Sequence, residues 1–156
     1  MSKRPYMTGA KNKAVVEKLT VALADMFVLY FKTHSFHWNV VGPHFKALHE
    51  MFEEQYTEIW EATDEVAERI RALDNFAPNN FKQIQEKANL KEAGQTPDAN
   101  GMVEILANDN RAIVKSFYEA IEAAEEAEDE GTIDVLIART QIHEQYAWML
   151  ESHLKE

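Results

Sequence analysis

The feature that most constrains this chain is the length over which apolar residues recur at helical spacing. Positions three and four apart lie on one face of a helix, so this repeat indicates helices with one buried side. Four such runs are present, at about residues 11–40, 43–73, 98–128 and 132–153. Only five Gly and four Pro occur in 156 residues, which argues against a sandwich or barrel of many short strands. The sequence therefore predicts an all-α fold.

The breaks between the runs predict how the helices are connected. Gly42-Pro43 separates the first two runs, Asp74-Asn75 ends the second, and Gly131-Thr132 separates the last two. The connection between the second and third runs is long and contains a short helical stretch at about residues 81–90. Four long helices with one long connection are typical of a four-helix bundle with a single crossover.

Charge and composition exclude several classes of protein. There are 27 acidic and 16 basic residues, a formal charge of −11, which opposes general binding to nucleic acid. The absence of Cys excludes disulfide scaffolds and thiolate metal sites. We find no apolar run of membrane-spanning length and no signal peptide, so we expect a cytoplasmic protein. We expect residues 1–10 to be a flexible tail and residues 11–156 to form one domain.

Four side chains that can bind metal lie on one face of the predicted second helix. Relative to His49, the residues Glu53, Asp64 and Glu68 lie at about 40°, 60° and 100° around the axis. Within each pair the two residues are one turn apart and can hold the same ion. His49 and Asp64, however, are about 22 Å apart along a helix. The two pairs therefore cannot meet within one chain.

Two copies of the chain would solve this problem. If the second helices pack antiparallel about a two-fold axis, His49 and Glu53 of one copy lie beside Asp64 and Glu68 of the other. His37, on the inward stripe of the first helix, would add a second imidazole. Such a mixed nitrogen and oxygen shell suits iron or zinc better than calcium or magnesium.

Spacing alone leaves other interpretations open. Acids four residues apart are usually a solvated helix face, and His37 and His49 could be buried core residues. A di-iron site within one bundle needs Glu-x-x-His on two helices. The third and fourth predicted helices contain no such motif. This absence favours the shared site over an intrachain one.

Two segments resemble the signatures of the Dps family, the mini-ferritins called DNA-binding proteins from starved cells. Residues 37–49 read H-W-N-V-V-G-P-H-F-K-A-L-H, and residues 64–69 read D-E-V-A-E-R. The resemblance implies a ferritin-like four-helix bundle with a short helix in the connection between helices 2 and 3. It also implies a homo-oligomeric shell of twelve subunits, built on two-fold dimers, with a hollow interior that stores iron.

The same resemblance implies a ferroxidase that protects against oxidative stress. His37, His49 and Glu53 of one subunit and Asp64 and Glu68 of its partner would bind the metal and form the catalytic centre. The substrate would be Fe(II), the oxidant hydrogen peroxide, and zinc would be a substitute for iron. Position 53 is commonly Asp in this family, so Glu53 leaves the second metal position less well defined.

The remaining aromatic and histidine residues carry less specific signals. Trp38 and Tyr56 are either sinks for stray oxidising equivalents or packing residues of the core or an interface. The other histidines lack a carboxylate constellation, and structural or surface roles are expected for His34, His44, His143 and His153.

Acidic residues concentrate between positions 116 and 138, where there is no Lys or Arg. Their simplest interpretation is a solvated helix end. In a symmetric shell, a ring of carboxylates at a three-fold axis would instead attract Fe(II). The family resemblance places such a pore near the start of the fourth helix, which makes Glu130 and Asp134 candidates and Asp129 a weaker one.

Four basic residues precede the first acid, Glu17: these are Lys3, Arg4, Lys11 and Lys13. Repeated in a shell, they could bind DNA through avidity. The alternative function is therefore a nonspecific DNA-compacting protein, nucleoid-associated, with secondary iron chemistry. A third interpretation is a helical oligomer without redox function.

Overall fold

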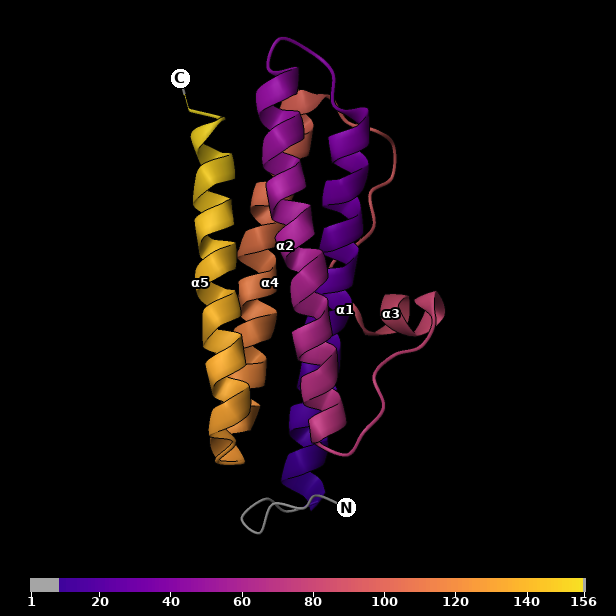
Figure 1. Cartoon of the computed structure of the whole chain (residues 1–156), viewed down its shortest axis with the longest axis vertical. Helices are drawn as coiled ribbons and strands as arrows, with labels where there is room; N and C mark the ends of the chain where they lie inside the picture. The colour runs from indigo at the N-terminus through magenta and orange to yellow at the C-terminus, as the bar shows by residue number, and fades with distance from the viewer. Residues whose placement is uncertain (1–8, 156) are drawn as a thin grey trace.

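The computed structural model describes residues 9–155, most of which lie in helices (Figure 1). No strand occurs in this range. The helices are α1 (Gly9–Asn39), α2 (Phe45–Ala72), α3 (Phe81–Lys87), α4 (Ala99–Glu126) and α5 (Glu130–Ser152).

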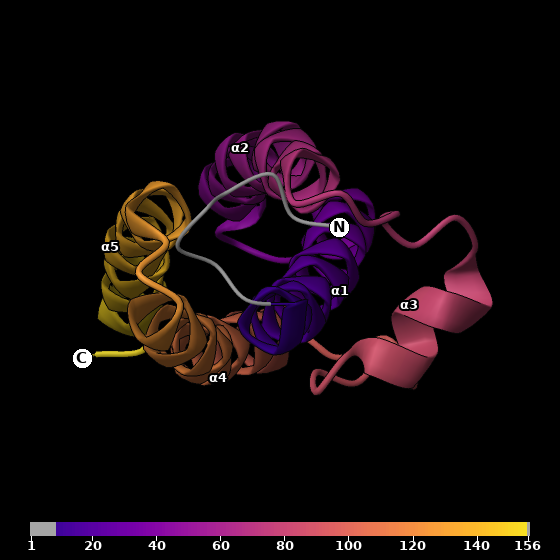
Figure 2. The same ribbon diagram turned by 90° about the horizontal axis from the view of Figure 1, so that it is seen from below.

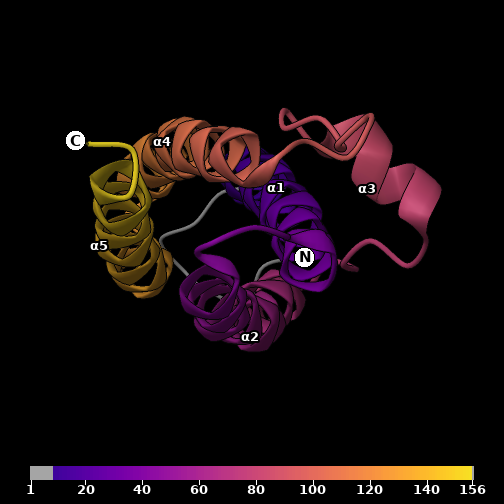
Figure 3. The same ribbon diagram turned by 90° about the horizontal axis from the view of Figure 1, so that it is seen from above.

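The four long helices form one bundle. Viewed from either end, they follow one another around the bundle in the order α1, α2, α5 and α4 (Figures 2 and 3). The α1 helix packs against α2 and α4, and α4 packs against α5. The connection from α2 to α4 carries α3 outside the bundle, where it contacts α1 (Figure 2). The predicted all-α bundle with one long crossover and a short helix within it is confirmed.

The predicted apolar stripes form the core between the long helices. Each of the four long helices buries large side chains completely, and each such burial contributes about 1.5–3 kcal/mol to folding. The fully buried side chains include Leu19, Met26 and Leu29 of α1, Phe52 and Ile59 of α2, Leu106, Ile113 and Phe117 of α4, and Leu136 of α5.

The crossover is fixed to the bundle by a buried carboxylate. Asp25 of α1 accepts hydrogen bonds from the backbone N–H of Asn89 at 2.6 Å and of Leu90 at 2.9 Å. The Ser116 hydroxyl of α4 donates to its other oxygen at 2.6 Å. Burial raises the pKa of Asp25. These bonds explain why α3 ends at Lys87 and not near residue 90, because Asn89 and Leu90 donate to Asp25 instead of continuing the helix.

The break between α4 and α5 differs from the prediction. Gly131 and Thr132 do not separate the helices, because both lie in the first turn of α5. The chain reverses at residues 127–129, where Glu128 adopts a positive φ of 55°. Asp129 caps α5 by accepting a hydrogen bond from the Thr132 N–H. The cap residue, and not the glycine, sets the helix start.

The first two helices also begin at different residues from those expected. The α1 helix begins at Gly9, so Gly9 and Ala10 are helical and not part of a tail, and Lys11 and Lys13 are helical too. The rest of the predicted tail, with Lys3 and Arg4, lies outside the described residues. The α2 helix begins at Phe45 because Gly42, with φ 122°, starts a turn that includes Pro43. No helix among residues 9–155 is long and apolar enough to cross a membrane.

Candidate metal centre

His37 and His49 form a tight pair where the end of α1 meets the start of α2. Their rings are stacked, with centroids 3.7 Å apart and an angle of 14° between the planes. His37 Nδ1 lies 2.7 Å from the His49 carbonyl oxygen, and His49 Nδ1 lies 2.7 Å from the His37 carbonyl oxygen. Two reciprocal hydrogen bonds therefore link the two helices at this point.

These hydrogen bonds determine which ring nitrogens can bind a metal. A carbonyl oxygen only accepts, so Nδ1 of each histidine must be the protonated nitrogen that donates. In the neutral form of such a ring, Nε2 carries a free lone pair, and this is the form of imidazole that binds metal. Because the rings are stacked, the pair is a preorganised source of two imidazole ligands. The donor set therefore fits a transition metal.

Aromatic residues surround the imidazole pair. Tyr56 lies against His37, with ring centroids 5.2 Å apart, and stacks on His34 at 3.8 Å. His34 Nδ1 is 3.1 Å from the Tyr30 hydroxyl, and its ring centroid is 4.4 Å from that of Trp38. Burial, together with the nearby His37, lowers the pKa of His34. His34 thus packs in an aromatic cluster, as the structural role expected for it requires.

The candidate carboxylates of α2 are exposed. Glu53, Asp64 and Glu68 all reach solvent, and none has a hydrogen bond or ion pair within residues 9–155. In that part of the chain, no three His, Asp or Glu side chains are grouped closely enough to hold one metal ion. The single chain thus brings the two histidines together but leaves Asp64 and Glu68 apart from them.

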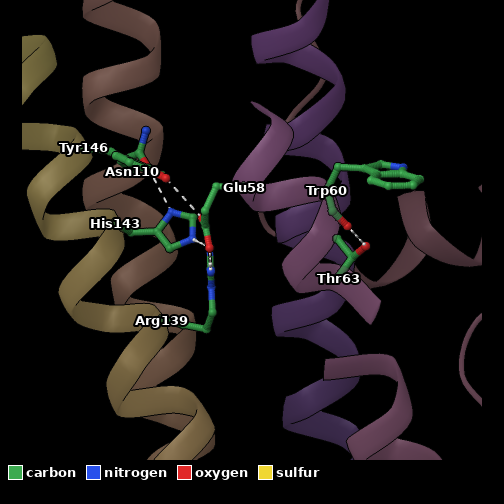
Figure 4. Close-up of polar contacts among 7 residues, drawn as sticks. All are labelled: Glu58, Trp60, Thr63, Asn110, Arg139, His143 and Tyr146. Atoms are coloured by element: carbon green, nitrogen blue, oxygen red, sulfur yellow. Dashed lines mark hydrogen bonds and ion pairs between the residues drawn. The ribbon is translucent and has the colours of Figure 1, made fainter. Parts of the chain in front are cut away.

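The opposite face of α2 carries a polar network that was not predicted from the sequence. Glu58 accepts hydrogen bonds from Arg139 of α5 at 2.5 and 3.0 Å and from the Tyr146 hydroxyl at 3.2 Å. Arg139 also donates to His143 Nε2 at 2.6 Å. The other ring nitrogen of His143 donates to Asn110 of α4 at 2.8 Å (Figure 4). The only sign of this network in the sequence is the presence of charged residues, Glu58 and Arg139, on the faces of α2 and α5 that point into the bundle.

Two members of this inner network, Arg139 and His143, are buried, and His143 is uncharged. Arg139 and His143 are 2% and 0% exposed. Burial, with the positive charge of Arg139, lowers the pKa of His143 well below its usual value. The histidine is therefore an uncharged structural residue, as expected. Trp60 lies on the other side of α2 from Glu58 and points away from the bundle (Figure 4).

The candidate pore residues separate into two kinds. Glu130 and Asp134 are exposed and lie one turn apart at the start of α5. Asp129 is completely buried, and its carboxylate receives Arg69 Nη2 at 2.7 Å and the Thr132 hydroxyl at 2.5 Å. The weaker candidate Asp129 is therefore wrong, because it caps a helix and pairs with an arginine inside the protein.

Comparisons with known proteins agree with this architecture. A family model described as a ferritin-like domain matches residues 16–156. DNA protection during starvation protein 2 of Bacillus anthracis is 39% identical over 145 residues, 93% of this chain and 99% of that protein. The crystal structure of Dps from Staphylococcus aureus has a TM-score of 0.89 and 37% identity, covering 92% of this chain and 97% of that one.

A more distant structure has the same fold. The Dps protein of Vibrio cholerae O1, described as a member of a superfamily of ferritin-like diiron-carboxylate proteins, has a TM-score of 0.92 and 29% identity. It covers 99% of this chain and 98% of that one. The chain is therefore a ferritin-like protein. Within that class it belongs to the Dps family.

Proposed function

We propose that this protein is a Dps-type ferroxidase that oxidises Fe(II) and stores the ferric product as mineral inside a hollow shell. The observation that carries this proposal is the stacked pair of His37 and His49, whose Nδ1 atoms are bound to backbone carbonyls. Both Nε2 atoms are thus held ready for a metal.

The missing ligands would come from a second copy of the chain. Asp64 and Glu68 lie about 22 Å along α2 from His49 and Glu53. Antiparallel packing of two α2 helices places each acidic pair beside the histidine pair of the other copy. Trp60 supports this arrangement, because it is 56% exposed and lies near the midpoint of the same face. An exposed tryptophan there would be covered by the partner helix.

The chemistry follows from the donor types. Two Fe(II) ions supply two electrons, and hydrogen peroxide with two protons accepts them to form two waters, so no hydroxyl radical is released. Carboxylates from Glu53, Asp64 and Glu68 would offset the charge of the ferric product. The imidazoles would set affinity and potential, and zinc would bind the same donors without redox change.

The exposed acidic pair Glu130 and Asp134 fits an entrance for Fe(II). In a shell of twelve subunits with three-fold axes, three copies of the pair would surround each such axis. The resulting negative potential would concentrate divalent cations. Exchange of both residues for their amides should slow iron uptake at low Fe(II) and leave the rate unchanged at saturation.

Mixing two inactive variants tests the shared centre. One chain carries His49→Ala and Glu53→Ala, and the other carries Asp64→Ala and Glu68→Ala. In a mixed dimer, one centre lacks all four side chains and the other keeps all four. Random mixing makes half of the dimers mixed, so about a quarter of the wild-type peroxide-dependent oxidation rate should return. No recovery in verified mixed dimers would contradict the shared centre.

DNA binding is the second candidate function, because relatives of this chain are named for DNA protection. The chain would have to bind through its basic N-terminal residues, since its formal charge is −11. A gel-shift experiment at physiological salt should show binding that deletion of residues 1–13 removes. Equal retardation by the truncated chain would place the DNA contact elsewhere.

A further inference from the structure

Arg69 does not point to the candidate metal face although it follows Glu68 directly. It lies about 200° around α2 from His49, whereas Glu68 lies at about 100°. The Arg69 side chain instead reaches the turn between α4 and α5. Its Nη2 donates to Asp129 at 2.7 Å, and its Nε donates to Thr132 Oγ1 at 2.9 Å.

The receiving turn is shaped for this guanidinium. Asp129 is completely buried and also binds the Thr132 N–H and hydroxyl, so its carboxylate is fixed. Gly131 leaves room for the arginine, because a Cβ atom there would lie 2.9 Å from Arg69 Nη2. We call Arg69, Asp129, Gly131 and Thr132 the clasp.

A second ion pair holds the same side of α2. Glu58 lies at about 180° around the helix and binds Arg139 of α5. Along the chain, Asp64 and Glu68 thus lie between two polar contacts that join the opposite side of α2 to α5 and to the α4–α5 turn. Because these two carboxylates have no partner of their own within residues 9–155, their direction depends on the helix that carries them.

We propose that the clasp is a positioning device for the acidic half of the metal centre. By holding Arg69 against the α4–α5 turn, it sets the rotation of the C-terminal half of α2 and so the direction of Asp64 and Glu68 toward the partner's histidines. Glu130 and Asp134 follow this turn in the first two turns of α5, so the clasp also fixes the two acidic pairs relative to each other. This inference rests on the proposed function.

Replacing Gly131 by Ala tests the clasp with a single added methyl group. The added Cβ collides with the end of a flexible side chain, so the fold can adapt while the guanidinium is displaced. We expect the assembled protein to bind Co²⁺ about 10-fold more weakly at the sites that need Asp64 and Glu68, as outer-shell changes do. Gly94→Ala is the matched control, because its Cβ meets nothing within 4 Å.

Arg69→Lys separates positioning from charge. Lysine keeps the positive charge and can reach Asp129, but it cannot also reproduce the planar contact with Thr132. We expect a Co²⁺ affinity between those of the wild type and Gly131→Ala, and an altered Co²⁺ absorption spectrum in both variants. A lower melting temperature with unchanged affinity and spectrum would show that the clasp is only structural and would overturn the inference.

The same titration examines the proposed function separately. Wild-type Co²⁺ binding that disappears on exchange of Asp64 and Glu68 for Ala supports the shared centre. If wild-type binding is insensitive to that exchange, the centre itself is wrong. If binding is sensitive to it but Gly131→Ala binds Co²⁺ as tightly as the wild type, only the clasp is overturned.

Discussion

In the described part of the chain, polar side chains are paired on one face of α2 and unpaired on the other. On the inner face, Glu58 is held by Arg139 and Tyr146, and these contacts continue to His143 and Asn110. On the outer face, the carboxylates of Glu53, Asp64 and Glu68 are exposed and have no partner within residues 9–155. One helix thus contains acids that the fold satisfies and acids that it leaves available.

This contrast explains why a list of acids on a helix does not identify a site. A buried charge must be paired to remain in a low-dielectric interior, so the inner contacts contribute to folding. An exposed carboxylate remains hydrated, so it has little effect on the free energy of folding and stays accessible to a ligand. The histidine pair is intermediate, because His37 and His49 join two helices through Nδ1 and leave Nε2 available to a ligand.

The largest expected effect is on the inner face. Glu58→Ala leaves Arg139 buried without a carboxylate and should lower the free energy of unfolding by about 3 kcal/mol. Urea denaturation measures this change. The double exchange Glu58→Leu with Arg139→Met removes both charges and should recover most of the loss. A loss below about 1 kcal/mol for Glu58→Ala would contradict the contrast between the faces.

The outer acids should affect activity without affecting folding. Asp64→Ala with Glu68→Ala should slow peroxide-dependent Fe(II) oxidation by about 100-fold or more, beyond the loss from outer-shell changes. The free energy of unfolding should stay within about 0.5 kcal/mol of wild type. The control is Glu61→Ala with Glu65→Ala, which makes the same charge change at two exposed positions of α2. Equal slowing in both variants would indicate a general charge effect.

The inner network should also make stability depend on pH. The pKa of His143 is lowered in the folded protein, so the unfolded chain binds its proton first, near pH 6.5. The contribution of His143 to the free energy of unfolding is therefore fully present above that pH. It decreases as the pH falls, by up to about 1.4 kcal/mol per pH unit. Urea denaturation in the presence of EDTA at pH 7.5, 6.5 and 5.5 measures this change. The free energy of unfolding should fall more steeply for wild type than for His143→Gln. Parallel curves would mean that His143 does not contribute.

The smallest measurable change in folding free energy is expected at the histidine pair. His49→Ala removes the His49 ring and its hydrogen bond to the His37 carbonyl, and should cost about 1 kcal/mol of folding free energy in metal-free protein. Asp64→Ala should cost nothing measurable in the same assay. A His49 variant as stable as wild type would show that its ring has no structural role and serves function alone.

Apolar spacing predicted the bundle well because burial of one helix face is a local pattern with a global consequence. The prediction misplaced the break between α4 and α5 because it relied on Gly131, whereas Asp129 caps α5 through a local hydrogen bond from the Thr132 N–H. The end of α3 was misplaced for a different reason, because Asp25 of α1 accepts hydrogen bonds from the backbone N–H groups of Asn89 and Leu90. No local pattern shows this second contact, since the partners are 64 and 65 residues apart in the chain.

The sequence by itself determined the helical architecture, the family resemblance and the distance that separates His49 from Asp64 on one helix. That distance depends only on helix rise, so no packing can change it. Only the tertiary structure decided which acids face the interior and which histidine nitrogens remain free. It also decided that Arg69 binds Asp129 in the α4–α5 turn. Such choices depend on contacts between helices, because a side chain's partner is set by what the fold brings within hydrogen-bond reach.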